Sequence, residues 1–146
     1  MINHDFPNIA KEYKRTIAGR FMLVEGAKLK DKLAGEDFLV TKKIDGIMLV
    51  VFVRDGELSA YTSHGNAVPG KLPCLQELKH IVNQGGINNM TLGAELYATI
   101  RDSGRERVCD VAKAIAHPEM HDKLHIEPFD LIDIEGEPCE VTHYNE

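Results

Sequence analysis

A lysine and an aspartate stand two residues apart in the Lys-Ile-Asp-Gly segment at 43–46. Residues 38–43 are rich in β-formers and predict a strand, in which alternate side chains point to opposite faces. Thr41, Lys43 and Asp45 would then share one face. A lysine beside apolar strand material loses part of its hydration, which lowers its pKa and leaves a nucleophilic amine near neutral pH. Taken alone, the segment also fits a surface lysine before a turn.

Three segments farther along the chain carry more residues of this kind. A glycine-containing turn at 62–66 holds Ser63 and His64. Glu95 lies inside an apolar segment, where a carboxylate needs a partner, and carboxylates with perturbed pKa values mark functional sites. Phe129 opens the sequence Phe-Asp-Leu-Ile-Asp. Taken singly, Phe129 fits a core position and His64 a surface loop.

Together, the four segments resemble the motifs of the covalent nucleotidyltransferases, the superfamily of DNA ligases, RNA ligases and capping enzymes. Segment 43–46 has the form Lys-x-Asp-Gly, and 62–66 is similar to the Ser-(Arg/Lys)-x-Gly turn. Segment 92–96, Leu-Gly-Ala-Glu-Leu, resembles the Asp-Gly-Glu-Leu strand. Segment 129–137 resembles the Phe-Asp-Leu-Leu-x-x-Asp-Gly-Glu strand of DNA ligases. The order and approximate spacing agree over residues 36–138.

The resemblance implies an ATP-dependent polynucleotide ligase that uses ATP and Mg²⁺. Lys43 would be the catalytic residue, forming a lysyl-AMP intermediate before AMP passes to a 5′-phosphate end and a nick is sealed. Glu95 would hold the sugar and the metal-bound phosphates, and Phe129 would stack on adenine. The implied ATP- and AMP-binding residues are Thr41, Asp45, Gly46, Ser63, His64, Glu95 and Phe129. The expected partners are ATP, nicked DNA or RNA, and a C-terminal remainder of the same chain.

The match also departs from the family pattern. Met48 stands where DNA ligases and capping enzymes place an arginine, and His64 stands where an arginine or lysine is expected. Ala94 separates the glycine and glutamate of the third motif. The later lysine-containing motifs do not follow Phe129, so the chain is expected to be the front part of a longer protein. DNA is favoured as the acceptor; the alternatives are an RNA ligase, a degenerate nucleotide-binding module without catalysis, or an unrelated small α+β domain.

The elements that must position these residues are an antiparallel sheet and a few helices. Strands are predicted at 47–53, 58–62, 90–100 and 124–134, the first two joined by an Asp-Gly hairpin turn at 54–57. Helices are predicted at 74–84 and 108–116. The fold class is therefore α+β, an antiparallel-sheet nucleotidyltransferase domain of the ATP-grasp-like ligase adenylation type, incomplete. Residues 1–35 form a lead-in with a short helix, and 36–146 form the front part of the adenylation domain.

Composition narrows the expected number of domains, the location and the kinds of partner. The chain has 146 residues and a net charge of −6, which fits one globular domain and indicates no basic nucleic-acid surface. Its three cysteines form no metal-binding pair. No apolar run is long enough for a membrane span and no secretory signal is visible, so a cytoplasmic location and no membrane partner are expected. His117, His121 and His125 are spaced four apart, but Pro118 between them favours a polar loop over a metal site.

Overall fold

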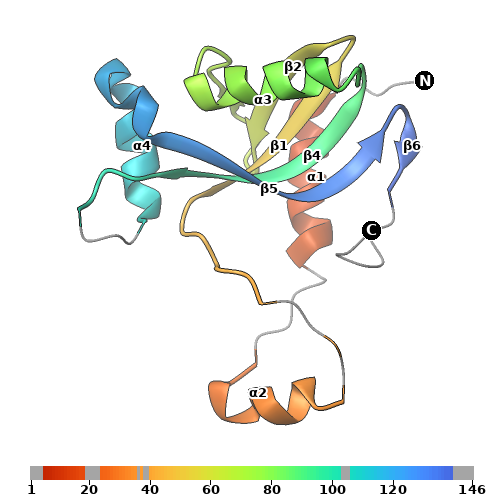
Figure 1. The fold of residues 1–146 in the computed structure, drawn as a ribbon, viewed down its shortest axis with the longest axis vertical. Helices are drawn as coiled ribbons and strands as arrows, with labels where there is room; N and C mark the ends of the chain where they lie inside the picture. The colour runs from red at the N-terminus through yellow and green to blue at the C-terminus, as the bar shows by residue number, and fades with distance from the viewer. Residues whose placement is uncertain (1–4, 19–23, 36, 38–39, 103–105, 140–146) are drawn as a thin grey trace.

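A computed structural model describes residues 5–18, 24–35, 37, 40–102 and 106–139. In these residues, six antiparallel strands form one sheet in the order β3-β2-β1-β4-β5-β6 (Figure 1). The strands are β1 (Ile47–Arg54), β2 (Glu57–Thr62), β3 (Ala67–Val68), β4 (Met90–Ala98), β5 (Leu124–Ile134) and β6 (Glu137–Pro138). The helices are α1 (Phe6–Ala18), α2 (Gly26–Leu33), α3 (Pro73–Gln84), α4 (Val108–Ala116) and the 3₁₀-helix η1 (Pro118–Lys123).

Strand β1 lies at the centre of the sheet, and this position accounts for its uninterrupted run of apolar residues. Residues 49–53 are all buried, because helices cover both faces of the sheet at this point. The hairpin that follows uses positive φ angles at Asp55 and Gly56, 51° and 79°, as the Asp-Gly pair predicts. The long strands, the helices α3 and α4, and the antiparallel α+β class are therefore confirmed.

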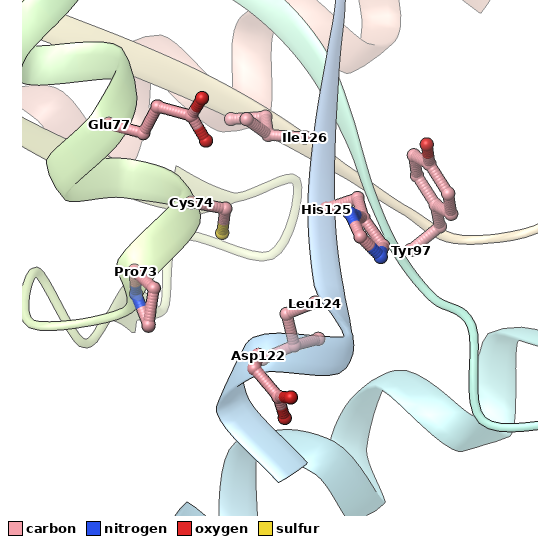
Figure 2. Close-up of a pocket in the computed structure, with 8 residues that line it drawn as sticks. All are labelled: Pro73, Cys74, Glu77, Tyr97, Asp122, Leu124, His125 and Ile126. Carbon is pink, nitrogen blue, oxygen red and sulfur yellow. The ribbon is translucent and has the colours of Figure 1, made fainter.

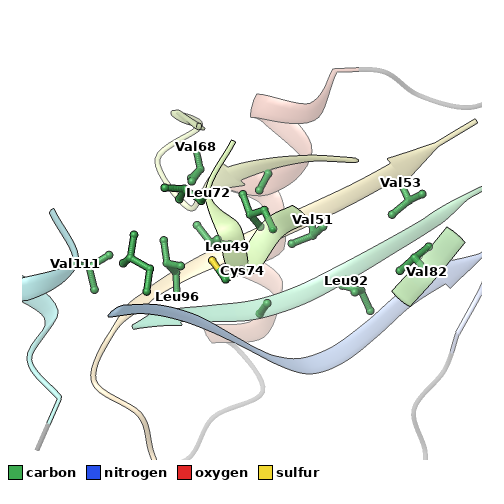
Figure 3. Packing of buried hydrophobic residues seen from close by; sticks show 14 of the residues in the cluster. Leu49, Val51, Val53, Val68, Leu72, Cys74, Val82, Leu92, Leu96 and Val111 are labelled. Atoms are coloured by element: carbon green, nitrogen blue, oxygen red, sulfur yellow. The ribbon is translucent and has the colours of Figure 1, made fainter. Parts of the chain in front are cut away.

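One face of the sheet carries the larger apolar core. Alternate residues of β1, including Leu49, Val51 and Val53, point to this face and share one apolar cluster with residues of α3 and α4 (Figure 3). Leu92 and Leu96 of β4 lie in the same cluster. The strand period of two then sends Met48, Val50 and Phe52, with their neighbours on β4, to the opposite face.

Helix α1 covers part of that opposite face. Phe6 stacks on Phe52 with ring centroids 4.3 Å apart, and Ala10, Tyr13 and Ile17 are buried against the sheet. The Tyr13 hydroxyl donates a hydrogen bond to the Asp130 carboxylate on β5 at 2.6 Å. The helix is thus fixed to strands at two points along its length, which makes it a wall of any site on this face.

The short elements α2, β3 and β6 were not predicted. Each lacks a strong pattern: α2 buries no residue, and β3 and β6 have two residues each. Residues 118–123, expected as a polar loop, form η1. Across the described ranges, no helix has the length and apolar character that a membrane crossing requires.

Candidate functional site

The strand predicted at 38–43 is wrong in the residues that the structure describes. Residues 40–45 have no regular secondary structure, and β1 begins only at Ile47, where pairing with Leu96 of β4 starts; residues 38–39 lie outside the described ranges. The β-propensity of these residues is therefore not enough to form a strand, because no described strand pairs with them. Thr41 and Lys43 are exposed and do not sit beside apolar strand material. The desolvation that the sequence suggested for Lys43 is absent from this conformation.

The segment is nevertheless held against the sheet. The Lys42 ammonium pairs with the Glu106 carboxylate at 2.6 Å, which ties the segment to the residues before α4. At its other end, the Gly46 N–H donates a hydrogen bond to Oε1 of Glu95 at 3.1 Å. Lys43 and Asp45 lie between these two anchors. The first and third sequence motifs, 49 residues apart, meet here.

Gly46 makes this meeting possible because it has no side chain. A Cβ built at Gly46 would overlap the Leu96 carbonyl oxygen, lie 2.9 Å from the Leu96 carbonyl carbon and 3.1 Å from Cβ of Tyr97. Two of these atoms are backbone and cannot rotate away. The sequence analysis expected Gly46 to be part of the site, and the structure identifies β4 as its close neighbour.

Glu95 has a perturbed carboxyl group. Burial raises its pKa, the Gly46 hydrogen bond opposes that rise, the nearby Asp45 charge adds to it and the Lys43 charge opposes it. The charges of Lys43 and Asp45 therefore act on Glu95 in opposite directions. The structure brings these three predicted residues into one electrostatic group.

Replacing Glu95 with glutamine is expected to change the stability difference between variant and wild type with pH. The variant should gain stability relative to wild type as the pH rises from acid to neutral. A raised folded-state pKa means that the folded protein holds the Glu95 proton more tightly than the unfolded chain does. The stability that this proton contributes is fully present below the pKa that Glu95 has in the unfolded chain. It is lost as the pH rises through the pKa that Glu95 has in the folded protein. The glutamine side chain keeps an oxygen for the Gly46 N–H without that loss. We expect a relative gain below about 1 kcal/mol, since Glu95 stays partly exposed to solvent.

The measurement is the midpoint of thermal unfolding for both proteins between about pH 4 and pH 7. The difference, variant minus wild type, should grow as pH rises. A difference that is flat or shrinks with pH would show that burial does not perturb Glu95 in the folded protein.

The turn at 62–66 joins the same face. Ser63 N–H donates to the Met48 carbonyl at 3.3 Å, and the Met48 Cα is the register partner of Glu95. Ser63, which directly follows β2, therefore forms a row with Met48 of β1 and Glu95 of β4. Strands are about 4.8 Å apart, so the row from Ser63 to Glu95 is roughly 10 Å long.

The turn is shaped by its own hydrogen bonds. Oγ1 of Thr62 accepts from the N–H groups of His64 and Asn66, at 3.3 and 3.2 Å. Ser63 is half-buried and His64 is exposed. Both predicted turn residues are thus at one end of the row, with their side chains available to a bound molecule.

Phe129 reaches the same face through a β-bulge. The register of β4 and β5 shifts twice, and the two unpaired β5 residues, Phe129 and Ile132, both join the cluster beneath α1. A bulge redirects side chains in this way. Phe129 is half-buried beside the α1 cluster, one strand away from the segment that holds Glu95. Its stacking on adenine stays a prediction.

The described residues contain no group of three or more His, Cys, Asp or Glu side chains arranged to hold a metal ion. Mg²⁺, however, is usually held by one or two protein carboxylates together with substrate phosphates. Glu95 with Asp45 beside it supplies that kind of donor set. His121 and His125 have other contacts, with the Ile115 carbonyl and the Thr99 hydroxyl, each at 2.9 Å.

A cavity of about 340 Å³ lies between α3 and the beginning of β5 (Figure 2). The α3 side contributes Pro73, Cys74 and Glu77, and burial raises the pKa of the Cys74 thiol. Tyr97 and His125 stand across the β5 ribbon from α3, their ring centroids 5.3 Å apart. No predicted site residue lines this cavity, but Tyr97 borders both regions because it follows Glu95 by two positions.

Sequence reasoning missed Tyr97, Lys42 and Glu106 as members of the site region. The position of Tyr97 could have been predicted from the sequence, because strand alternation places it on the same face of β4 as Glu95. The position of Glu106 could not, because its contact with Lys42 spans 64 residues.

Comparison with known proteins gives a fold match. Neither a protein-family model nor a curated protein sequence matches this chain. Among solved structures, the ligase domain of M. tuberculosis LigD matches with a TM-score of 0.53, at 20% sequence identity over 70% of this chain. This chain has the fold of part of a DNA ligase domain. Mycobacterial DNA ligase D complexed with ATP and MES matches with the same TM-score, identity and coverage. The chain spans 31% of the length of each of these two ligase chains.

Proposed function

We propose that this chain is the nucleotide-binding part of an ATP-dependent polynucleotide ligase, and that Lys43 accepts AMP. The observation that carries the proposal is the hydrogen bond from Gly46 to Glu95. It joins the segment bearing Lys43 to a carboxylate from a separate strand, as a site for nucleotidyl transfer requires. The fold shared with the LigD ligase domain supports the same assignment.

In the proposed first step, the neutral Nζ of Lys43 attacks the α-phosphorus of ATP. A P–N bond forms while the P–O bond to the β-phosphate breaks, and pyrophosphate leaves with the electron pair. The proton lost by the amine passes to solvent, which reaches the exposed Lys43. The amine must be deprotonated before it can attack.

In the later steps AMP moves to a nucleic acid end. An oxygen of a 5′-phosphate attacks the adenylyl phosphorus, the P–N bond breaks, and Lys43 recovers its proton. A 3′-hydroxyl then attacks the 5′-phosphorus and AMP leaves. We propose nicked DNA as the acceptor.

The other site residues would bind and orient the nucleotide. Asp45 and Glu95 would hold Mg²⁺ and the sugar region, and Mg²⁺ when bound neutralises phosphate charge. Thr41, Gly46, Ser63 and His64 would line the nucleotide, and Phe129 would contribute a stacking surface worth about 1–3 kcal/mol.

The test is the intact mass of the protein after incubation with ATP and Mg²⁺. We expect a gain of one adenylyl group, which peptide mapping should place on Lys43 rather than on the adjacent Lys42. Addition of 5′-phosphorylated nicked DNA should discharge the adduct and seal the nick; discharge by nicked RNA alone would make the protein an RNA ligase. No adduct on this chain or on the full-length product of its reading frame would overturn the proposal.

A second candidate is a nucleotide-binding module without catalysis. The exposure of Lys43 favours it, because the lysine lacks the apolar surroundings that help to activate an amine as a nucleophile. This module would bind ATP reversibly in a calorimetric titration and show no change in mass.

A further inference from the structure

A lysine on α1 lies directly over the turn at the end of the Ser63–Met48–Glu95 row. A Cβ built at Gly65 would lie 2.7 Å from Cε of Lys11 and 3.3 Å from the Pro7 carbonyl oxygen. The Lys11 side chain therefore crosses Gly65, and its ammonium group, bonded to Cε, lies at the turn. Gly65 has a φ of +82°, which already favours glycine at this position.

The ammonium group of Lys11 has no partner among the residues that the structure describes. Lys11 is exposed, and within the described ranges it has no hydrogen bond or ion pair. Several other basic residues are paired: Arg15 with Glu12, Lys42 with Glu106, Lys79 with Glu57. No described residue therefore competes with an outside anion for the ammonium of Lys11.

The proposed reaction needs a cation of this kind. Lys43 must be neutral when it attacks, so it cannot at that moment balance the charge of the phosphates. Asp45 and Glu95 are acidic and add negative charge to the face. A cation at the Ser63 end of the row would bind phosphate groups about 10 Å away from Glu95, which is within the span of a bound nucleotide or a strand end.

The turn that Lys11 crosses carries side chains that suit a phosphate. Ser63 offers a hydroxyl donor and His64 a ring N–H, and no side-chain hydrogen bond occupies either within the described ranges. Helix α1 holds Lys11 in place, because Phe6 and Tyr13 fix the helix on both sides of it.

We propose that Lys11, with Ser63 and His64, forms a phosphate-binding subsite. This inference rests on the proposed function and adds a residue from outside the four motifs. The phosphate belongs either to the triphosphate of ATP or to the 5′ end of a nucleic acid strand. Both offer charged oxygens for hydrogen bonds from an ammonium, a hydroxyl and an imidazole.

The test compares Lys11→Ala with Lys14→Ala and Lys11→Arg. Lys14 is exposed on the same helix, so its loss changes the net charge equally without touching the turn. The first arm measures adduct formation as a function of ATP concentration, and the second measures discharge of the preformed adduct by 5′-phosphorylated nicked DNA. We expect Lys11→Ala to reduce the apparent affinity for ATP or for the DNA end, in one of these two measurements, by about tenfold. Lys11→Arg should restore that affinity, and Lys14→Ala should match wild type. The affected arm identifies the source of the phosphate.

A third arm measures binding of inorganic triphosphate and of 5′-phosphorylated against 5′-hydroxyl DNA, neither of which requires an adduct. If wild type forms no adduct yet loses phosphate binding on Lys11→Ala, the proposed function fails and the subsite stands. If Lys11→Ala equals Lys14→Ala in all three arms, the subsite is overturned, whatever the fate of the ligase assignment. Unfolding midpoints of the variants should match wild type, since both lysines are exposed.

Discussion

Lys43→Arg is expected to reduce the rate of AMP attachment by at least about a thousandfold, so that no adduct is detected. Arginine keeps the positive charge that acts on Glu95, so the site should keep its electrostatic balance. Its guanidinium stays protonated at any working pH and has no electron pair to attack phosphorus. The loss would therefore isolate the chemistry of the amine from the charge of the side chain.

The matched control is Lys42→Arg, because it changes the neighbouring lysine and keeps a cation for Glu106. Intact mass after incubation with ATP and Mg²⁺ should show full labelling of this control and none of Lys43→Arg. If Lys43→Arg were labelled like the control, the acceptor would be another residue and the first motif would have been misread.

The strong sequence patterns predicted the framework of the fold for clear physical reasons. The apolar run at 47–53 can only be buried on both faces, and the Asp55-Gly56 turn returns the chain beside it. An antiparallel sheet follows from these two features. The face that Glu95 occupies on that sheet could be predicted because alternation fixes which face a strand residue occupies.

The weaker patterns failed where long-range pairing decides the outcome. Residues 40–43 have strand-like composition, but the pairing of β1 with β4 ends at Ile47, although β4 itself continues to Ala98. The bulges that redirect Phe129 depend on the register of β4 against β5, which no local signal contains. The contact of Lys11 with Gly65 depends on how α1 packs on the sheet.

These failures concern position, and the segment that bears Lys43 still meets Glu95 through Gly46. Lys43 lies in an irregular segment rather than a strand, yet its anchors at Lys42 and Gly46 are both satisfied. A segment fixed at its ends and irregular between them can shift its lysine when a nucleotide binds. The three-dimensional packing, which the sequence does not show, brings the Gly46 N–H to Glu95.

Gly46→Ala should test that geometry with the second-largest effect. The new methyl group would overlap the backbone of Leu96, so the segment must move away from β4. That movement breaks the Gly46–Glu95 hydrogen bond and displaces Lys43 and Asp45 together. Displacement of reacting groups by about 1 Å costs on the order of a hundredfold in rate. We expect AMP attachment to fall by at least that factor.

The cost in stability should be smaller than the cost in rate. Forcing a methyl group into a packed contact costs about 1–3 kcal/mol, and the irregular segment on one side can relieve part of it. Gly70→Ala is the control, because a Cβ built at Gly70 meets no atom within 4 Å. The rate of adduct formation and the unfolding midpoint should be measured for both variants. Normal adduct formation by Gly46→Ala would mean that contact with β4 does not position Lys43, and that the Gly46–Glu95 hydrogen bond is not part of the catalytic site.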